Sequence, residues 1–457
     1  MNNLKHVKIF FLLMFALVAL FFIKTAAADA GTIKTNSYNR RLNQAADSNV
    51  KRGSVLDRNG VVLAESVLDG GVYVRKYPFG SAFSHMVGYS VLGKSGVEKK
   101  YNFELQTLNG ELSQRFNNVL NGSELVCNDV KLTLDSELQK KADSLLGNRT
   151  GSVVILEPSS GKILAMCSNP DFNPATVDEK WAELSSDVKS SLLNRASQGL
   201  YPPGSIFKVI TAYAALEADM APDSFECAGE IEIAGTVIHC SGGKAHGAVD
   251  MKSAFAQSCN AYFAALGKAL GSDRLKAAAA AFGIGRPLSF PLEYSVSSFP
   301  LKPDAESAEL LLTAIGQGNT LVTPLQAALI ASAAANGGIV MKPYLLDSVL
   351  TPGGKQISKT VPELLTALDS RICLELAELM TEVVASGTGR DAKLKSVSVA
   401  GKTGTAQNSS GKDHSWFIAF APAESPEIAV CVMLESIGGG NRAMLIAKEL
   451  LNEFFAD

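Results

Sequence analysis

The hydrophobic and polar positions divide the chain into segments of different periodicity. The first segment is an uninterrupted apolar run, residues 9–23, flanked by Lys8 and Lys24. The run is short for a membrane span but sufficient if the flanking lysines extend to the interface. A cleaved signal peptide is the alternative, because the segment before the run is basic and residues 26–30 contain small-residue cleavage sites.

Short apolar segments joined by turn residues predict two β-hairpins. The first pairs residues 53–56 with residues 61–64 around the turn Asp-Arg-Asn-Gly. The second pairs residues 152–157 with residues 162–166 around Pro-Ser-Ser-Gly.

The rest of the pattern is helical in the middle and strand-like toward the C-terminus. Residues 136–146 are helical, as is most of the central part of the chain. Strands resume around Ser396 and include residues 428–434, before an amphipathic helix from Arg442 to Phe455. Strands at both ends with helices between them predict one sheet that is completed by segments distant in sequence.

Length and charge narrow the function only slightly. A chain of 457 residues is long enough for two or three domains with sizeable cores. With 19% charged residues and a net charge of −3, the composition gives no indication of a nucleic-acid partner.

The cysteines are odd in number, so they cannot all pair within one exported chain. The seven are Cys127, Cys167, Cys227, Cys240, Cys259, Cys373 and Cys431. Cys227 and Cys240 bracket residues 230–238, which alternate like a hairpin around Gly235. Their side chains can therefore meet, either as a disulfide or as two thiols.

Two other interpretations concern the same region. A metal site that includes His239 and His246 is disfavoured, because the cysteines lack the paired spacing typical of zinc sites. Cys259 is interpreted as a small buried side chain rather than a nucleophile.

Ser205 begins the segment Ser-Ile-Phe-Lys directly after Tyr-Pro-Pro-Gly. The prolines and the apolar residues that follow predict the start of a buried helix, on which residues three apart share a face. Lys208 can therefore hydrogen-bond the Ser205 hydroxyl, and an amine whose pKa is lowered by burial can remove its proton during attack on a carbonyl. Alone the pair is a weak signal, since most such pairs lie on solvated helix faces.

A second polar segment follows residues 251–256, which look helical. Ser258 and Asn260 offer a hydroxyl and an amide that can relay a proton or hold a substrate. A simple polar turn is the alternative interpretation.

A third segment, residues 401–406, has the sequence Gly-Lys-Thr-Gly-Thr-Ala and precedes the strand-like residues 416–420. It predicts an edge strand whose small residues allow a substrate backbone to approach closely. A phosphate-binding loop is rejected, because Ser396 stands where that motif requires a glycine five residues before Gly401.

In this order, Ser-x-x-Lys, Ser-x-Asn and Lys-Thr-Gly form the motif set of penicillin-recognising serine enzymes. The chain resembles class B penicillin-binding proteins, and the resemblance covers nearly everything after the first forty residues. Other segments that carry it are residues 52–60, 194–196, 315–318, 323–326 and 414–417. Within that family the chain is similar to the shorter members.

The resemblance implies an α+β fold: a penicillin-recognising serine transpeptidase domain, with an antiparallel sheet and a helical subdomain, after a small β-rich pedestal. It favours an uncleaved membrane anchor over residues 1–24, a stalk and dimerisation-type pedestal over 25–147, and the transpeptidase domain over 148–457. We therefore expect a single-pass protein of the cell membrane with an extracytoplasmic catalytic domain.

The catalytic roles that the resemblance implies fall on four residues. Ser205 is the acylated nucleophile and Lys208 its base, while Ser258 and Asn260 complete the proton network and hold the stem peptide. Such an arrangement divides acyl transfer into two steps through a covalent acyl-enzyme.

The implied substrate-binding residues lie in the third motif. Lys402 and Thr403 attract the terminal carboxylate of the stem peptide, and Gly404 and Thr405 continue the same strand. The backbone N–H groups of Ser205 and Thr405 form the oxyanion hole, where each donor typically contributes a factor of about a hundred or more to the rate.

The implied activity is peptidoglycan D,D-transpeptidation, with beta-lactams as covalent inhibitors and no cofactor. Expected partners are stem peptides, lipid-linked precursor strands and a membrane glycosyltransferase of the shape, elongation, division and sporulation type; no nucleic acid is expected. A D,D-carboxypeptidase or beta-lactamase, in which water deacylates the serine, is one alternative. A non-catalytic penicillin-binding sensor or scaffold is the other.

Overall fold

The computed structural model describes residues 2–28, 50–108, 126–408, 411–438 and 440–456. Helix α1 (Asn2–Ala28) contains an apolar window, Lys5–Phe22, that is long enough to cross a membrane and lies where a signal sequence would also lie. The stalk predicted within residues 25–50 falls almost entirely outside the described residues.

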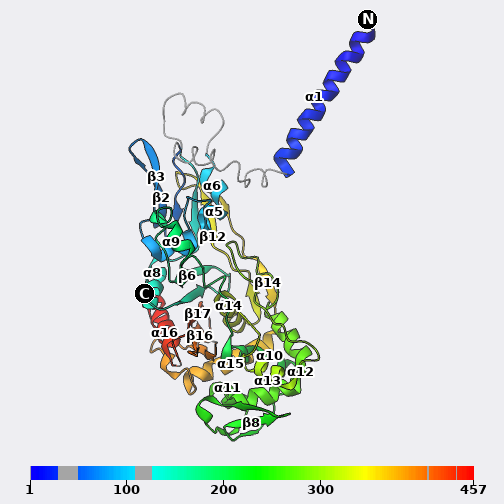
Figure 1. Cartoon of the computed structure of the whole chain (residues 1–457), viewed down its shortest axis with the longest axis vertical. Helices are drawn as coiled ribbons and strands as arrows, with labels where there is room; N and C mark the ends of the chain where they lie inside the picture. Colours follow the sequence, from blue (N-terminus) through cyan, green and yellow to red (C-terminus); the bar gives the residue numbers. More distant parts are fainter. Residues whose placement is uncertain (1, 29–49, 109–125, 409–410, 439, 457) are drawn as a thin grey trace.

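A six-stranded sheet lies at the end of the molecule nearest α1 (Figure 1). Its order is β13-β12-β4-β1-β2-β3. The strands are β1 (Val55–Leu56), β2 (Val62–Asp69), β3 (Val72–Lys76), β4 (Asp129–Leu132), β12 (Leu346–Leu350) and β13 (Gln356–Lys359). The antiparallel pairing of β1 with β2 confirms the first predicted hairpin. Strands β12 and β13 come from beyond residue 147, so this sheet contains strands from both sides of the predicted domain boundary. The boundary itself stays a prediction.

Short helices pack on this sheet around a buried ion network. They are η2 (Gly80–Phe83), α4 (Ser84–Val87), α5 (Gly96–Lys100) and α6 (Asn102–Gln106). Glu98 of α5 is fully buried and accepts from Arg52 Nε at 2.8 Å and from Arg75 Nε at 2.6 Å. Burial favours the neutral acid, but the two guanidinium groups more than offset burial and lower the pKa of Glu98.

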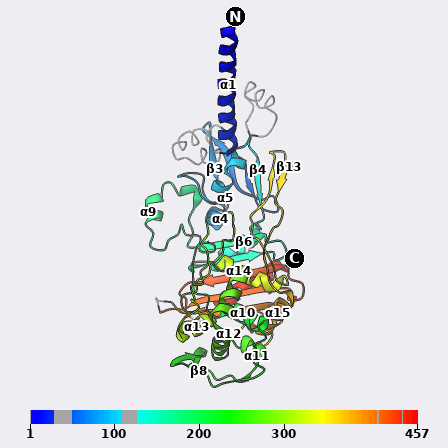
Figure 2. The same cartoon turned by 90° about the vertical axis from the view of Figure 1, so that its right-hand side faces the viewer.

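A five-stranded antiparallel sheet, in the order β15-β16-β17-β5-β6, forms the centre of the molecule (Figure 2). The strands are β5 (Gly151–Leu156), β6 (Ile163–Asn169), β15 (Ala400–Ala406), β16 (His414–Ala421) and β17 (Ile428–Leu434). The pairing of β5 with β6 confirms the second hairpin, and β17 beside β5 confirms that distant segments complete the sheet. Strand β15 begins at Ala400 rather than around Ser396, because its partner β16 ends at Ala421, before Pro422, and offers nothing to pair with.

Helices cover both faces of the central sheet. On one face lie α8 (Ser136–Leu146) and α16 (Arg442–Phe454), two helices that the sequence predicted. The Asp135 side chain caps α8 by accepting from the N–H groups of Glu137 and Leu138. On the other lies α14 (Pro324–Ala335), which is buried on all sides. One continuous apolar cluster joins Trp416 of this sheet to Val55 of the six-stranded sheet.

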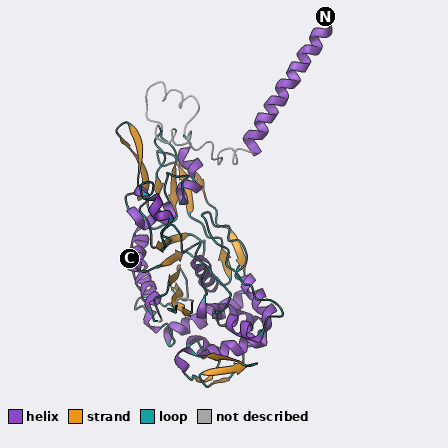
Figure 3. Ribbon diagram, viewed as in Figure 1, coloured by secondary structure: helices purple, strands orange, loops and turns teal. Residues whose placement is uncertain are grey.

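A helical lobe follows, together with small two-stranded sheets (Figure 3). Its helices are η4 (Gly204–Phe207), α10 (Lys208–Glu217), α11 (Met251–Ala256), α12 (Asn260–Ala281), α13 (Ser307–Ala314) and α15 (Ser370–Ala385). The small strands are β7 (Phe225–Cys227), β8 (Glu230–Ile233), β9 (Thr236–His239), β10 (Gly247–Val249), β11 (Ile339–Met341) and β14 (Leu364–Ala367). The β8–β9 hairpin lies at the far end of the molecule, whereas the two-stranded sheet of β11 and β14 lies on the side toward the six-stranded sheet (Figures 1 and 3). Short connecting helices are η3 (Pro174–Thr176), α9 (Trp181–Ser185), η5 (Ser241–Gly243) and η6 (Arg390–Ala392).

The hairpin predicted around Gly235 is present as β8 and β9, with Gly235 at φ +77° in the turn. Cys227 and Cys240 do meet, but not as a disulfide: both are free, and their sulfur atoms lie 3.7 Å apart. A disulfide requires about 2.05 Å.

Candidate active site

Ser205 lies in the 3₁₀ turn η4, and Lys208 is the first residue of α10. Ile206 and Phe207 between them are fully buried, as the sequence predicted for this helix start. Gly204 has φ +56°, a left-handed conformation that glycine adopts without strain. Ser205 itself stays partly exposed, unlike the two residues that follow it.

The Lys208 amine is fully buried and joins the second motif. Its Nζ donates to Ser258 O at 2.7 Å, to Ser258 Oγ at 3.1 Å and to Asn260 Oδ1 at 2.6 Å. Within the described residues no hydrogen bond joins Lys208 to Ser205, although the sequence analysis expects one. Burial lowers the pKa of Lys208 to about 7, so the neutral amine is accessible near neutral pH.

Lys402, on β15, donates to the same hydroxyl. Its Nζ donates to Ser258 Oγ at 3.0 Å and to Thr403 O at 3.1 Å, and its side chain is fully buried. Burial and then the charge of Lys208 hold the pKa of Lys402 well below its ordinary value. The structure therefore joins Lys402 to Lys208 through the Ser258 hydroxyl, whereas the resemblance implies only a carboxylate-binding role for Lys402.

Ser258 lies between α11 and α12 in the left-handed region, at φ +55°. Such a conformation typically costs about 1–3 kcal/mol for a residue with a side chain and persists only where neighbours enforce it. Asn260 begins α12 and donates from Nδ2 to His239 O at 2.9 Å, so one amide connects Lys208 to the β8–β9 hairpin.

Strand β15 is an edge strand, as predicted. Its glycines nevertheless pack closely against other parts of the protein. A Cβ at Gly404 would lie 2.9 Å from Ile206 Cγ2, and a Cβ at Gly204 would lie 2.3 Å from Thr405 O. The glycines thus let the turn that carries Ser205 pack directly on the strand that carries Thr405. The indole of Trp416 holds the same turn by donating to Pro202 O at 3.1 Å.

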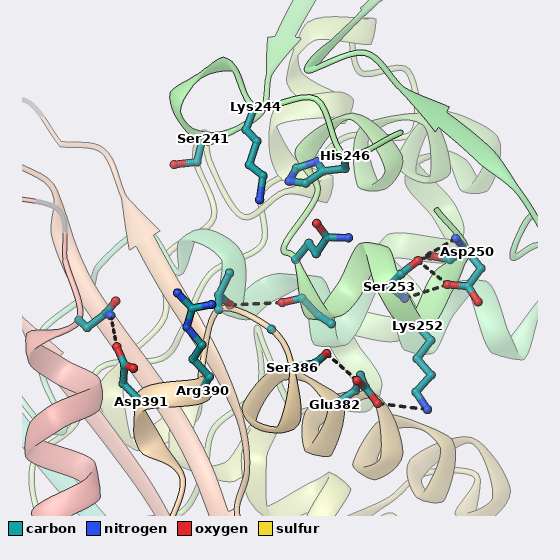
Figure 4. A pocket seen from close by; sticks show the side chains of 15 residues that line it. Ser241, Lys244, His246, Asp250, Lys252, Ser253, Glu382, Ser386, Arg390 and Asp391 are labelled. Atoms are coloured by element: carbon teal, nitrogen blue, oxygen red, sulfur yellow. Dashed lines mark hydrogen bonds and ion pairs between the residues drawn. The ribbon is translucent and has the colours of Figure 1, made fainter. Parts of the chain in front are cut away.

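A cavity of about 720 Å³ opens between the helical lobe and the segment after α15 (Figure 4). Its charged lining includes Lys244, Lys252 and Arg390. Thr388 also lines it, and its Oγ1 lies 2.7 Å from Thr403 Oγ1, which connects the cavity to β15.

The sequence analysis missed Thr388 and assigned no role to Gln317, whose Nε2 donates to Thr405 O at 3.4 Å. The signal for Thr388 was the small-residue run Ser-Gly-Thr-Gly directly after a helix. Its glycine at 387 lets the chain approach α11, since a Cβ there would lie 2.2 Å from Ala256 O.

An antiparallel sheet covered by helices, with the three sequence motifs at one edge of it, is the arrangement expected of a penicillin-binding transpeptidase domain. The chain belongs to the penicillin-binding protein transpeptidase family: the model described as penicillin binding protein transpeptidase domain matches residues 151–456. A second model, penicillin binding protein A dimerisation domain, matches residues 52–130.

Known relatives are similar over most of the chain. The peptidoglycan D,D-transpeptidase PbpA of Mycolicibacterium smegmatis is 34% identical, over 96% of this chain and 94% of the relative. The D,D-transpeptidase domain of a peptidoglycan glycosyltransferase from Eggerthella lenta superposes with a TM-score of 0.82 at 33% identity, covering 90% of this chain and 99% of that structure. An imipenem acyl-enzyme complex of penicillin-binding protein A from M. tuberculosis superposes with a TM-score of 0.81 at 32% identity, covering 88% and 98%.

Proposed function

We propose that the protein is a serine-type peptidoglycan D,D-transpeptidase that is acylated by beta-lactams at Ser205. The observation that carries this proposal is the convergence of Lys208 and Lys402 on Ser258 Oγ, beside the turn that presents Ser205. The names of the relatives support the substrate class, and the acyl-enzyme complexes of the M. tuberculosis protein support reaction with beta-lactams.

In the proposed reaction, Ser205 Oγ attacks the carbonyl of the penultimate D-alanine while the neutral Lys208 amine accepts the hydroxyl proton. The tetrahedral intermediate collapses, the peptide C–N bond breaks, and the terminal D-alanine leaves with a proton relayed through the Ser258 hydroxyl. The amine of a second stem peptide then attacks the ester, forming the cross-link and returning the proton to Ser205. Lys402 and Thr403 bind the carboxylate of the donor peptide, and the N–H groups of Ser205 and Thr405 stabilise the oxyanion.

The test is to incubate the full-length protein in detergent with a fluorescent penicillin and to follow adduct formation and release by intact mass. We expect one stable adduct in the native protein, none in Ser205→Ala, and normal labelling in Ser186→Ala, whose exposed hydroxyl bonds Ala182 O and does not line the cavity. No adduct in the native protein would contradict acylation, and rapid release would favour a carboxypeptidase or beta-lactamase. A peptide ending in D-alanyl-D-alanine with an added acceptor amine then separates cross-linked from hydrolysed product.

The location and the membrane partner belong to the same proposal. Helix α1 is retained as a single-pass anchor, with the rest of the chain extracytoplasmic, and a membrane glycosyltransferase supplies the glycan strands. The intact mass of the membrane-bound protein tests the anchor: it includes residues 1–24 if the helix is retained. A mass that begins after residue 28 would contradict an anchor.

A further inference from the structure

Three cysteines and a histidine form a cluster next to the second motif, and one of the cysteines, Cys259, lies between Ser258 and Asn260. Cys227 Sγ lies 3.7 Å from Cys240 Sγ and 3.5 Å from Cys259 Sγ, and the last two sulfur atoms lie 3.8 Å apart. His246 Nδ1 lies 3.4 Å from Cys227 Sγ, and all four atoms lie within 4.8 Å of one another. The three cysteines are buried and free.

These separations are those of a metal tetrahedron. With zinc–sulfur bonds of about 2.3 Å, tetrahedral angles place two sulfur ligands about 3.8 Å apart. With a zinc–nitrogen bond of about 2.0–2.1 Å, the sulfur-to-nitrogen separation becomes about 3.6 Å. The three sulfur atoms thus already have the mutual spacing of three ligands of one tetrahedral zinc ion, and His246 Nδ1 has about the spacing from Cys227 Sγ that a fourth ligand requires.

We propose that Cys227, Cys240, His246 and Cys259 bind one zinc ion. Three sulfur ligands and one imidazole select zinc over magnesium or calcium, which require oxygen ligands. Four protein ligands complete the tetrahedron and leave no position for water, so the ion is structural rather than catalytic.

The surroundings suit a thiolate ligand. Cys259 caps the N-terminus of α12, where its sulfur accepts the N–H of Tyr262 at 3.4 Å and the helix end favours negative charge. Backbone hydrogen bonds fix the other ligands, since His246 N donates to Cys227 O at 3.1 Å and Cys240 N donates to Gly229 O at 2.8 Å. His239, the other histidine of this region, points elsewhere and pairs with exposed Glu230 at 2.8 Å.

The ion ties the β7–β10 segment to the second motif. Cys227 ends β7, Cys240 and His246 lie between β9 and β10, and Cys259 stands between Ser258 and Asn260. Zinc would therefore hold in place the loop on which Ser258 keeps φ +55°. The four ligands are thus positioning residues for the proton network, a consequence that rests on the proposed function, whereas zinc binding itself does not.

The first measurement is the zinc content of full-length protein purified in detergent, by mass spectrometry of the metal. We expect about one zinc per chain, lost in Cys227→Ser and in Cys240→Ser. Cys373→Ser and Cys431→Ser are the matched controls, because both cysteines are equally buried but lie outside the cluster. Substoichiometric zinc in the native protein, or zinc that persists in the cluster variants, would overturn the proposal.

The absorption spectrum of native protein, produced by cells grown with cobalt, is a second measurement, and it does not depend on the folding of a variant. We expect the intense visible bands and the sulfur-to-cobalt charge-transfer absorption of a tetrahedral thiolate site, which the weak spectrum of octahedral cobalt would contradict. For the positioning role, chelation should slow penicillin acylation of still-folded protein, and added zinc should restore the rate. An unchanged rate in folded, zinc-free protein would refute positioning while leaving Ser205 acylation intact.

Discussion

Lys208 and Lys402 donate to the same oxygen, Ser258 Oγ, at 3.1 Å and 3.0 Å. Both amines are fully buried, and each comes from a different layer, α10 and β15. Two ammonium groups this close in a dry site repel each other, and the charge of Lys208 contributes to the lowered pKa of Lys402. Burial and this repulsion both favour the neutral form of Lys402, and burial favours the neutral form of Lys208. In the proposed mechanism, a neutral Lys208 amine is the base.

The pH dependence of acylation follows from this arrangement. Because burial lowers the pKa of Lys208 to about 7, the neutral amine that accepts a proton becomes the major form as the pH rises through that value. We expect the acylation rate to level off above pH 7 and to fall about tenfold for each unit below it. Stopped-flow acylation by a chromogenic beta-lactam from pH 5 to 9 measures this, and a profile that rises toward low pH would contradict Lys208 as the base.

Removing the shared hydroxyl tests the network itself. Ser258→Ala leaves Lys208 and Lys402 without their common partner and deletes the proton relay, so we expect acylation to slow by about 10²–10⁴-fold. The matched control is Ser186→Ala, whose exposed hydroxyl bonds the backbone oxygen of Ala182 and should leave the rate unchanged. Thermal melts accompany both variants, and a Ser258→Ala rate within about twofold of the native protein would contradict the relay.

Much of the fold could be predicted because its signals are local. The two hairpins have alternating strands with turn residues between them, and helix α8 is preceded by Asp135 as its cap. The three motifs were found by spacing and order, and the edge position of β15 followed from its small residues. The structure places Ser205 and Lys208 at a helix start and residues 402–405 on an edge strand, as predicted, whereas the roles of the eight site residues stay a prediction.

The sequence alone could not predict which distant segments contact each other. Nothing local in β12 indicates that, besides its neighbour β13, it pairs with β4, more than 200 residues earlier. The burial of Lys402 and its bond to Ser258 depend on how β15 packs against α15 and η4. The cysteine cluster was discounted because its members are not paired in sequence, although folding brings Cys227 and Cys259 to 3.5 Å.

Gly204 provides a geometric test of how Ser205 is positioned. Gly204→Ala places a Cβ 2.3 Å from Thr405 O and requires φ +56° of an alanine, so the turn must move off β15. We expect penicillin acylation to fall by more than about tenfold, since small misplacements of a nucleophile are costly. Gly60→Ala is the control, with φ +89° but no atom within 4 Å of the added Cβ. Equal acylation by the two variants would show that close packing on β15 is not required.

The buried ion network of the six-stranded sheet gives the last prediction. Glu98 is fully buried between Arg52 and Arg75, so Glu98→Gln leaves two buried guanidinium groups without a counter-charge. Removing one partner from such a network typically costs about 3–5 kcal/mol, whereas an exposed ion pair contributes about 1 kcal/mol or less. Glu137→Gln is the matched control, because Glu137 pairs with Lys140 on the surface.

Denaturant unfolding of the full-length protein at neutral pH compares the two variants. Because folding lowers the pKa of Glu98, its ionised carboxylate adds to the free energy of unfolding at pH values above the ordinary glutamate pKa. This stabilisation is lost as the pH falls through the pKa of the folded state. The native protein should therefore lose more stability than Glu98→Gln on acidification. Equal unfolding midpoints for Glu98→Gln and Glu137→Gln would contradict a stabilising role. Acylation of Ser205 below the unfolding transition should stay normal in both variants, since the network contacts neither β15 nor α10.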